Sequence, residues 1–365
     1  MRRQELVLIA ATALLFAVPR HATAQAPSEP PPPAATPTFG EQVEVSEVLL
    51  DAQVTDKEGN VIVGLGKDDF QVEEDGKPVA LTDVRFYSSR PLIDVAGHPT
   101  TPAESQRFFI LFFQDQRQLN AEAPGVLARE LDAGRRARDW AGKLGAGDYA
   151  AVVSFNSSLV VDADFTRDRK TLQGAIDEAI KGGSPAGNWP SRLPPEGQPS
   201  LLRNLPSGNA VRDASPTIEE ALQTLARAAG KLVGRKNLIL FATGFGNVNS
   251  FGQYVPDKQR YEPMMRALND ANVAVYAVDL FSADTEAPLE GALSNLANQT
   301  GGKYYQHLVS FATPLARIAE ETTGYYLLAY QATHPRGTSG YQTVKVTVKN
   351  PGFRVKAREG YLYGE

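Results

Sequence analysis

A continuous apolar run at residues 108–113 constrains the fold of this chain more than any other feature. Polar residues bound it on both sides, which is typical of a parallel strand covered on both faces. Further strand patterns follow, and amphipathic helical patterns separate them. These strands are predicted at 150–155, 159–161, 238–242, 273–279 and 303–305. The alternation predicts an α/β fold, with a doubly wound, mostly parallel sheet covered by helices on both faces.

The helical patterns place apolar residues on one face. In the first, Leu127, Leu131 and Gly134 belong to the predicted buried stripe and Arg129 lies opposite. The clearest pattern begins at Pro216, with Ser215 as its expected N-cap. The predicted helices span 123–144, 168–180, 216–232, 262–271, 289–300 and 311–322.

Short β patterns lie on both sides of this series. Those before it fall at 43–54, 70–72 and 79–86, and those after it at 325–330, 344–348 and 355–361. Neither group has enough strands to be stable alone, so we expect them to pair into one antiparallel β-sandwich. The alternative is two separate β appendages. The predicted division is therefore a first β-sandwich segment at 41–90, an inserted α/β domain at 104–323, and a second β-sandwich segment at 324–365.

The first residues have the pattern of an export signal. Arg2 and Arg3 precede an apolar run, and Ala22-Thr23-Ala24 offers a cleavage site, so 1–24 is a predicted signal peptide. An uncleaved anchor is the alternative. Residues 25–40 are rich in Pro and Ala and predict a disordered linker. The mature chain is then exported, periplasmic or extracellular, and without a membrane span.

Composition excludes several classes of function. The chain has no cysteine among its 365 residues, so thiolate metal sites, disulfides and cysteine nucleophiles are excluded. Its formal net charge of −5 gives no global attraction for nucleic acid. The four histidines show no paired spacing, and no nucleophile elbow or phosphate loop occurs. We therefore expect no catalytic residue and no enzymatic activity.

Several segments together carry a family resemblance. They are Val54-Thr55-Asp56-Lys57, the block 68–77, Gly324-Tyr325-Tyr326-Leu327-Leu328-Ala329-Tyr330, and 352–361. With the leader and the β/α series, they resemble bacterial von Willebrand factor A-related proteins of the acidobacterial type. The resemblance implies a von Willebrand factor A-like domain that binds a ligand and has no enzymatic activity.

Such domains usually hold Mg²⁺ in a metal-ion-dependent adhesion site, with an Asp-x-Ser-x-Ser motif, a threonine and a second aspartate. Here Asp115 matches the first aspartate, but Arg117 stands in place of a serine and Thr243 in place of the second aspartate. Ser215 and Thr217 flank the threonine position. One carboxylate beside a cation is a poor divalent site, so we expect a degenerate, metal-free site in which Arg117 pairs with Asp115. No cofactor is expected, and Asp115 is only a weak metal candidate.

The ligand-binding rim is expected where an open sheet presents its loops, outside the carboxyl ends of its strands. Asn247, Asn249, Asp279 and the long loop 182–209 are placed on or near it. The sequence thus predicts an exported protein-binding or scaffolding module whose partner is a protein outside the cytoplasm. The alternatives are a secreted hydrolase or carbohydrate-binding protein using the 182–209 loop as a lid, and a purely structural envelope component.

Two other groups of residues have competing interpretations. The carboxylates at 68–69 and 73–75 are either the solvated edge of a hairpin or a calcium site. Tyrosines at 325, 326, 330, 361 and 363 either pack in the core or form a carbohydrate platform. We favour the hairpin edge and core packing.

Overall fold

The computed structural model describes residues 47–89, 106–115, 123–182, 193–281, 289–334 and 338–364, with the strand backbone at 92–93, 99–100 and 103–104. These residues belong to the unit Val45–Glu365. The predicted signal peptide, the 25–40 linker and Arg117 lie outside the described residues.

Six strands form the central sheet, in the order β10-β9-β8-β11-β14-β15. Neighbouring strands are parallel except for β10, which runs antiparallel to β9. Every residue of β8, β11 and β14 is buried, because helices cover both faces. The predicted mixed α/β fold with a mostly parallel sheet is confirmed. Its strands are β8 (Phe108–Gln114), β9 (Tyr149–Phe155), β10 (Leu159–Thr166), β11 (Lys236–Ala242), β14 (Val273–Asp279) and β15 (Lys303–Tyr305).

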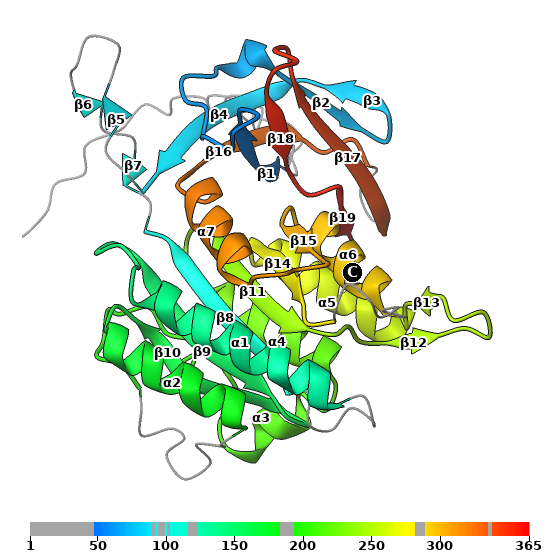
Figure 1. Cartoon of the computed structure of the whole chain (residues 1–365). Helices are drawn as coiled ribbons and strands as arrows, with labels where there is room; N and C mark the ends of the chain where they lie inside the picture. Colours follow the sequence, from blue (N-terminus) through cyan, green and yellow to red (C-terminus); the bar gives the residue numbers. More distant parts are fainter. Residues whose placement is uncertain are drawn as a thin grey trace, which may run out of the picture. The chain divides into compact units, whose positions relative to one another are not determined.

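Alternate residues of the strands pack into two separate cores, one on each face of the sheet. Figure 1 shows the helices on the two faces. Helices α1, α2 and α7 complete one core, and α3, α4, α5 and α6 complete the other. The bounds are α1 (Ala123–Ala141), α2 (Arg169–Lys181), α3 (Asn209–Asp213), α4 (Ile218–Ala229), α5 (Lys258–Asp270), α6 (Glu290–Gln299) and α7 (Ala312–Glu321).

Two helices differ from the sequence prediction. Helix α4 begins at Ile218, and its N-cap is Thr217, whose hydroxyl accepts a hydrogen bond from the Glu220 N–H, so the prediction of Ser215 as N-cap was wrong. In α1 the predicted stripe is buried at Gly134 but differs at neighbouring positions. Leu131 is exposed, whereas Glu130 and Trp140 are buried.

Two mostly antiparallel sheets contain the strands from both ends of the described chain, and the short strand β7 runs parallel to its neighbour β4. One has the order β18-β1-β16-β4-β7 and the other β19-β17-β2-β3, and both contribute to a third hydrophobic core. Within them β1 pairs with β16, and β2 with β17. The bounds are β1 (Glu47–Thr55), β2 (Phe70–Glu74), β3 (Lys77–Val79), β4 (Leu81–Ser88), β7 (Ala103–Glu104), β16 (Gly324–Gln331), β17 (Gly340–Val348), β18 (Arg354–Lys356) and β19 (Gly360–Tyr363).

Two segments predicted as single strands are each divided between the two sheets. The segment 79–86 separates into β3 and β4, and 355–361 separates into β18 and β19. The chain therefore turns a corner between sheets, which alternation along one strand does not reveal. The remaining elements are the 3₁₀ turn η1 (Lys67–Asp69) and the two-residue strands β5 (Leu92–Ile93), β6 (Pro99–Thr100), β12 (Asn247–Val248) and β13 (Tyr254–Val255).

Candidate functional site

The candidate site is the carboxyl edge of the central sheet, where β9, β8, β11 and β14 end. Strand order reverses between β8 and β11, since the chain continues from β8 to β9 and β10 on one side and returns to β11 on the other. Open α/β sheets bind ligands at such a switch point. Asp115 follows β8 directly, and Thr243 follows β11 directly. The structure therefore brings these two predicted residues to neighbouring strand ends.

Both residues are largely buried, and the backbone around them is fixed. The Asp115 N–H donates to the Phe155 carbonyl at 3.0 Å. Across the switch point, the Gln114 Nε2 donates to the Gly244 carbonyl at 3.2 Å. Gly244 has a φ of +110° and lies against Leu289, where a Cβ would meet atoms at 2.5 Å, so only glycine fits there. The centre of the edge is thus rigid and closely packed.

Ser215 and Thr217 have structural partners at this edge. The buried Ser215 hydroxyl donates to the Val211 carbonyl and accepts from the Leu159 N–H, which fixes the start of β10. Thr217 caps α4 and also donates to the Glu220 carboxylate at 2.8 Å. Both hydroxyls are therefore engaged within the chain.

Asp279 ends β14 and is buried. One carboxylate oxygen accepts from the Phe281 N–H at 2.8 Å, and the other accepts from the Tyr304 hydroxyl at 2.7 Å. Burial raises the pKa of the Asp279 carboxyl, and these two hydrogen bonds offset part of the effect.

Arg129 is a residue of this edge that the sequence pattern assigned to the solvent face of α1. Its Nε donates to the Leu280 carbonyl at 2.8 Å and its Nη2 to the Leu308 carbonyl at 3.0 Å. The guanidinium also lies 4.9 Å from the centroid of the Phe311 ring. Burial lowers the pKa of Arg129, and the field of Asp279 opposes that effect. Arg129 therefore tethers two loops, a role that sequence periodicity does not indicate.

A small hairpin, β12–β13, leaves the carboxyl edge after β11 and projects from the sheet (Figure 1). Asn247 is its first residue and is exposed. The side chain of Asn249 accepts hydrogen bonds from the Phe251 and Gln253 N–H groups at 2.9 and 3.0 Å, which fixes the turn. Phe251 at the tip is 85% exposed, and Val248 and Val255 are also exposed. The hairpin thus presents apolar side chains on a preorganised turn.

The described part of the carboxyl edge offers few free oxygens to a divalent metal. Among the described residues, no group of three or more histidine and carboxylate side chains is placed to hold an ion. Both oxygens of Asp279 accept hydrogen bonds from the chain, and Ser215 and Thr217 are engaged as well. A hard cation needs several free oxygens, and those of Asp279, Ser215 and Thr217 already have partners within the chain.

The described portion of the long loop, residues 193–208, lies elsewhere than predicted. Asp164, toward the end of β10 remote from Leu159, accepts from the Ser200 hydroxyl at 2.6 Å and the Leu201 N–H at 2.7 Å. Asn204 donates to the Ala228 carbonyl near the end of α4. Leu201 and Leu205 are buried. This portion is fixed against the sheet by core side chains and is not a lid on the carboxyl edge.

Residues from the acidic segment 68–75 and from the tyrosine group are buried in the antiparallel sheets. Glu74 is buried and accepts from Thr333 and Gln342 at 2.7 and 2.8 Å, so it is not part of a solvated hairpin edge as predicted. Tyr326 and Tyr330 are fully buried, as predicted for core packing.

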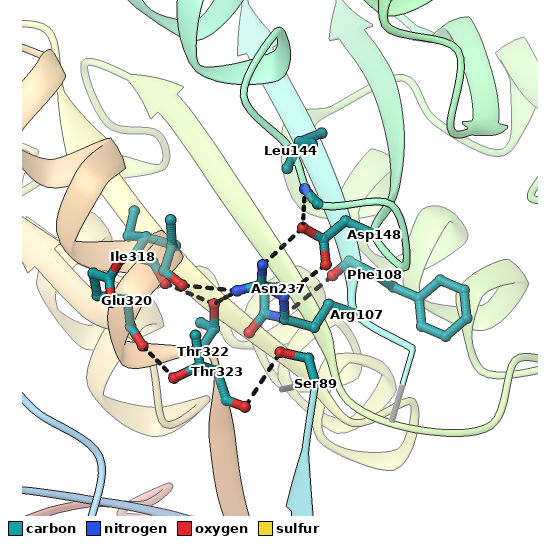
Figure 2. Close-up of polar contacts among 12 residues, drawn as sticks. Ser89, Arg107, Phe108, Leu144, Asp148, Asn237, Ile318, Glu320, Thr322 and Thr323 are labelled. Carbon is teal, nitrogen blue, oxygen red and sulfur yellow. Dashed lines mark hydrogen bonds and ion pairs between the residues drawn. The ribbon is translucent and has the colours of Figure 1, made fainter. Parts of the chain in front are cut away.

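A polar cluster joins the antiparallel strands to the amino edge of the central sheet (Figure 2). Arg107, just before β8, binds the Asp148 carboxylate and donates to the Ala319 carbonyl at 2.7 Å. The Ser89 N–H donates to the Thr323 carbonyl at 3.0 Å, so the two points where the chain passes between the sheets are held together. No sequence motif marks this cluster.

No family model matches the sequence, and no curated protein matches it. Among solved structures, BatB from Bacteroides thetaiotaomicron is 14% identical, with 59% of this chain and 96% of that chain covered and a TM-score of 0.36. An aerotolerance-related membrane protein from Bacteroides fragilis is 10% identical, with 59% and 98% covered and a TM-score of 0.35. The SpRpn10 VWA domain is 11% identical, with 58% and 94% covered and a TM-score of 0.34. None of the three shares enough sequence to show the family of this chain.

Proposed function

We propose that this chain is an exported, non-enzymatic protein-binding module, built on a von Willebrand factor A-like domain with a degenerate, metal-free adhesion site and a flanking β-sandwich. Its partner is a protein in the periplasm or outside the cell. The doubly wound strand order and the leader at residues 1–24 support this proposal. Among the described residues, no helix has the length and hydropathy of a membrane span.

The observation that carries the proposal is the β12–β13 hairpin at the carboxyl edge. Exposed aromatic residues supply large contact area in protein interfaces, and a fixed turn loses little conformational entropy on binding. Phe251 meets both conditions, because Asn249 holds its backbone. The buried Asp115, Thr243 and Asp279 then stabilise the base of the contact surface, while Asn247 and the exposed hairpin side chains touch the partner.

The test compares two substitutions at exposed apolar residues. The mature protein and its Phe251→Asp and Val233→Asp variants are used to capture partners from an envelope fraction. Val233 is 94% exposed and precedes β11, so it lies at the opposite edge of the sheet. We expect one protein to bind the wild type and Val233→Asp and to be lost with Phe251→Asp. Equal capture by all three proteins, or capture by none, contradicts the proposal.

A further inference from the structure

A pocket of about 370 Å³ lies at the amino end of β15, on the opposite edge of the central sheet from the candidate site. Its walls come from β15, from the end of α7, from β18 and from the turn at 56–59. These elements belong to different sheets, so the pocket forms only in the folded chain.

Five cations line this pocket. Lys57 comes from the turn at 56–59, Lys303 from β15, Arg317 from α7, and Arg354 and Lys356 from β18. Glu321 is the carboxylate among them. We call this group the basic pocket.

The two lysines share one carboxylate. Lys356 Nζ lies 2.6 Å from one oxygen of Glu321, and Lys303 Nζ lies 3.8 Å from the other. Arg317 and Arg354 make no ion pair or side-chain hydrogen bond within the described residues of the chain. Glu321 therefore offsets at most one of the two lysine charges and leaves the two arginine charges unpaired.

Three other carboxylates border the pocket. Asp56 is engaged, because its two oxygens accept from the backbone and side chain of Asn60 at 2.8 and 2.7 Å. Glu58 and Glu320 are exposed to solvent, as are Lys57, Arg317 and Arg354, so solvent screens the charges of all five side chains.

The crowding of cations affects Lys303 directly. Burial lowers the pKa of the Lys303 ammonium, and repulsion from Lys356, Arg317 and Arg354 lowers it further against the attraction of Glu321. An ion pair that only tied β18 to α7 would need Lys356 and Glu321 alone. Arg317 and Arg354 have no role in such an ion pair, and they add positive charge to the pocket.

We propose that the basic pocket binds a phosphate dianion, with Arg317 and Arg354 as its main ligands. Guanidinium groups present parallel donors that match phosphate oxygens, and a doubly charged anion offsets the repulsion among the cations. The volume leaves room for the small organic group of a phosphate monoester. This site is independent of the protein-binding edge.

The test measures binding of inorganic phosphate to the full chain by calorimetry in a chloride buffer of constant ionic strength. We expect saturable binding that weakens at least about tenfold in Arg317→Gln/Arg354→Gln. Glu321→Gln removes the competing carboxylate and is expected to tighten binding about threefold. A second series uses glycerol phosphate in place of inorganic phosphate. Tighter binding of glycerol phosphate indicates a site for a phosphate monoester, and tighter binding of inorganic phosphate indicates a site for the free ion.

The matched control is Arg212→Gln/Arg227→Gln, which removes the same charge from exposed positions on α3 and α4. It is expected to bind phosphate as the wild type does. Absence of saturable binding by the wild type, or equal weakening in both double variants, overturns the proposal. Circular dichroism of each variant identifies any loss of binding that comes from unfolding.

Discussion

Arg107 holds Asp148 through two parallel hydrogen bonds, Nε to Oδ1 and Nη2 to Oδ2, each 2.7 Å long. Both side chains are largely buried. The pair connects the start of β8 to the loop before β9, and Arg107 continues to the end of α7 through the Ala319 carbonyl. It lies where the chain enters the central sheet (Figure 2).

Removing one partner of this pair leaves the other charge buried without compensation. We expect Asp148→Asn to lower the free energy of unfolding by about 3 kcal/mol. Urea denaturation of Arg107→Leu, Asp148→Asn and the double variant measures the coupling. Additive effects of the two substitutions would show that the pair is energetically independent.

Burial of Lys236 is expected to make the free energy of unfolding rise with pH in the alkaline range. It is 2% exposed, its Nζ donates to the Leu232 and Gly234 carbonyls, and burial lowers its pKa to about 8. Between pH 8 and about 10 the unfolded chain binds more protons than the folded chain, so the free energy of unfolding increases with pH, by at most about 3 kcal/mol.

Lys236→Met should flatten this rise, and the exposed Lys231→Met should retain it. Chemical denaturation at several pH values up to about 9 measures both. Burial raises the pKa of Tyr254 and Tyr261, so these groups lower stability once the tyrosines of the unfolded chain ionise near pH 10. An unchanged slope in Lys236→Met would assign the pH dependence to other groups.

Magnesium is expected to leave the melting temperature unchanged, because a ligand that does not bind the folded state cannot stabilise it. Differential scanning calorimetry with increasing MgCl₂, against NaCl of equal ionic strength, measures this. A saturable rise of several degrees that disappears in Asp115→Ala would mean that the carboxyl edge does bind the ion.

Deleting residues 324–365 tests the predicted domain division. The deletion removes β16 and β17, the partners of β1 and β2, so backbone amides at 47–89 should lose protection from hydrogen exchange. Amides of β8 and β11 should stay protected if the α/β domain folds by itself. Normal protection at 47–89 would contradict a discontinuous β domain.

The central sheet could be predicted from the sequence because its strands are buried on both faces and its helices are amphipathic. The run 108–113 is the core of β8, and the helix predicted at 168–180 corresponds closely to α2. These patterns reflect the burial of each segment, which determines the spacing of apolar residues within that segment.

What the sequence could not supply depends on contacts between distant segments. Arg129 was assigned to solvent because its partners, the carbonyls of Leu280 and Leu308, are remote in sequence. The divided strands β3/β4 and β18/β19 alternate like single strands, and only the sheet order separates them. The β12–β13 hairpin was also missed, although Asn249 and Gly252 are turn residues that could have indicated it.

The hydrogen bond between the Ser89 N–H and the Thr323 carbonyl brings the exit and the return of a segment of more than two hundred residues to one point. A segment with adjoining ends can be exchanged as a cassette, because a short linker spans the gap. Gene rearrangement or protein engineering could therefore replace the α/β domain with another module while β1, β4 and β16 keep their pairing. The antiparallel strands would then act as a reusable frame.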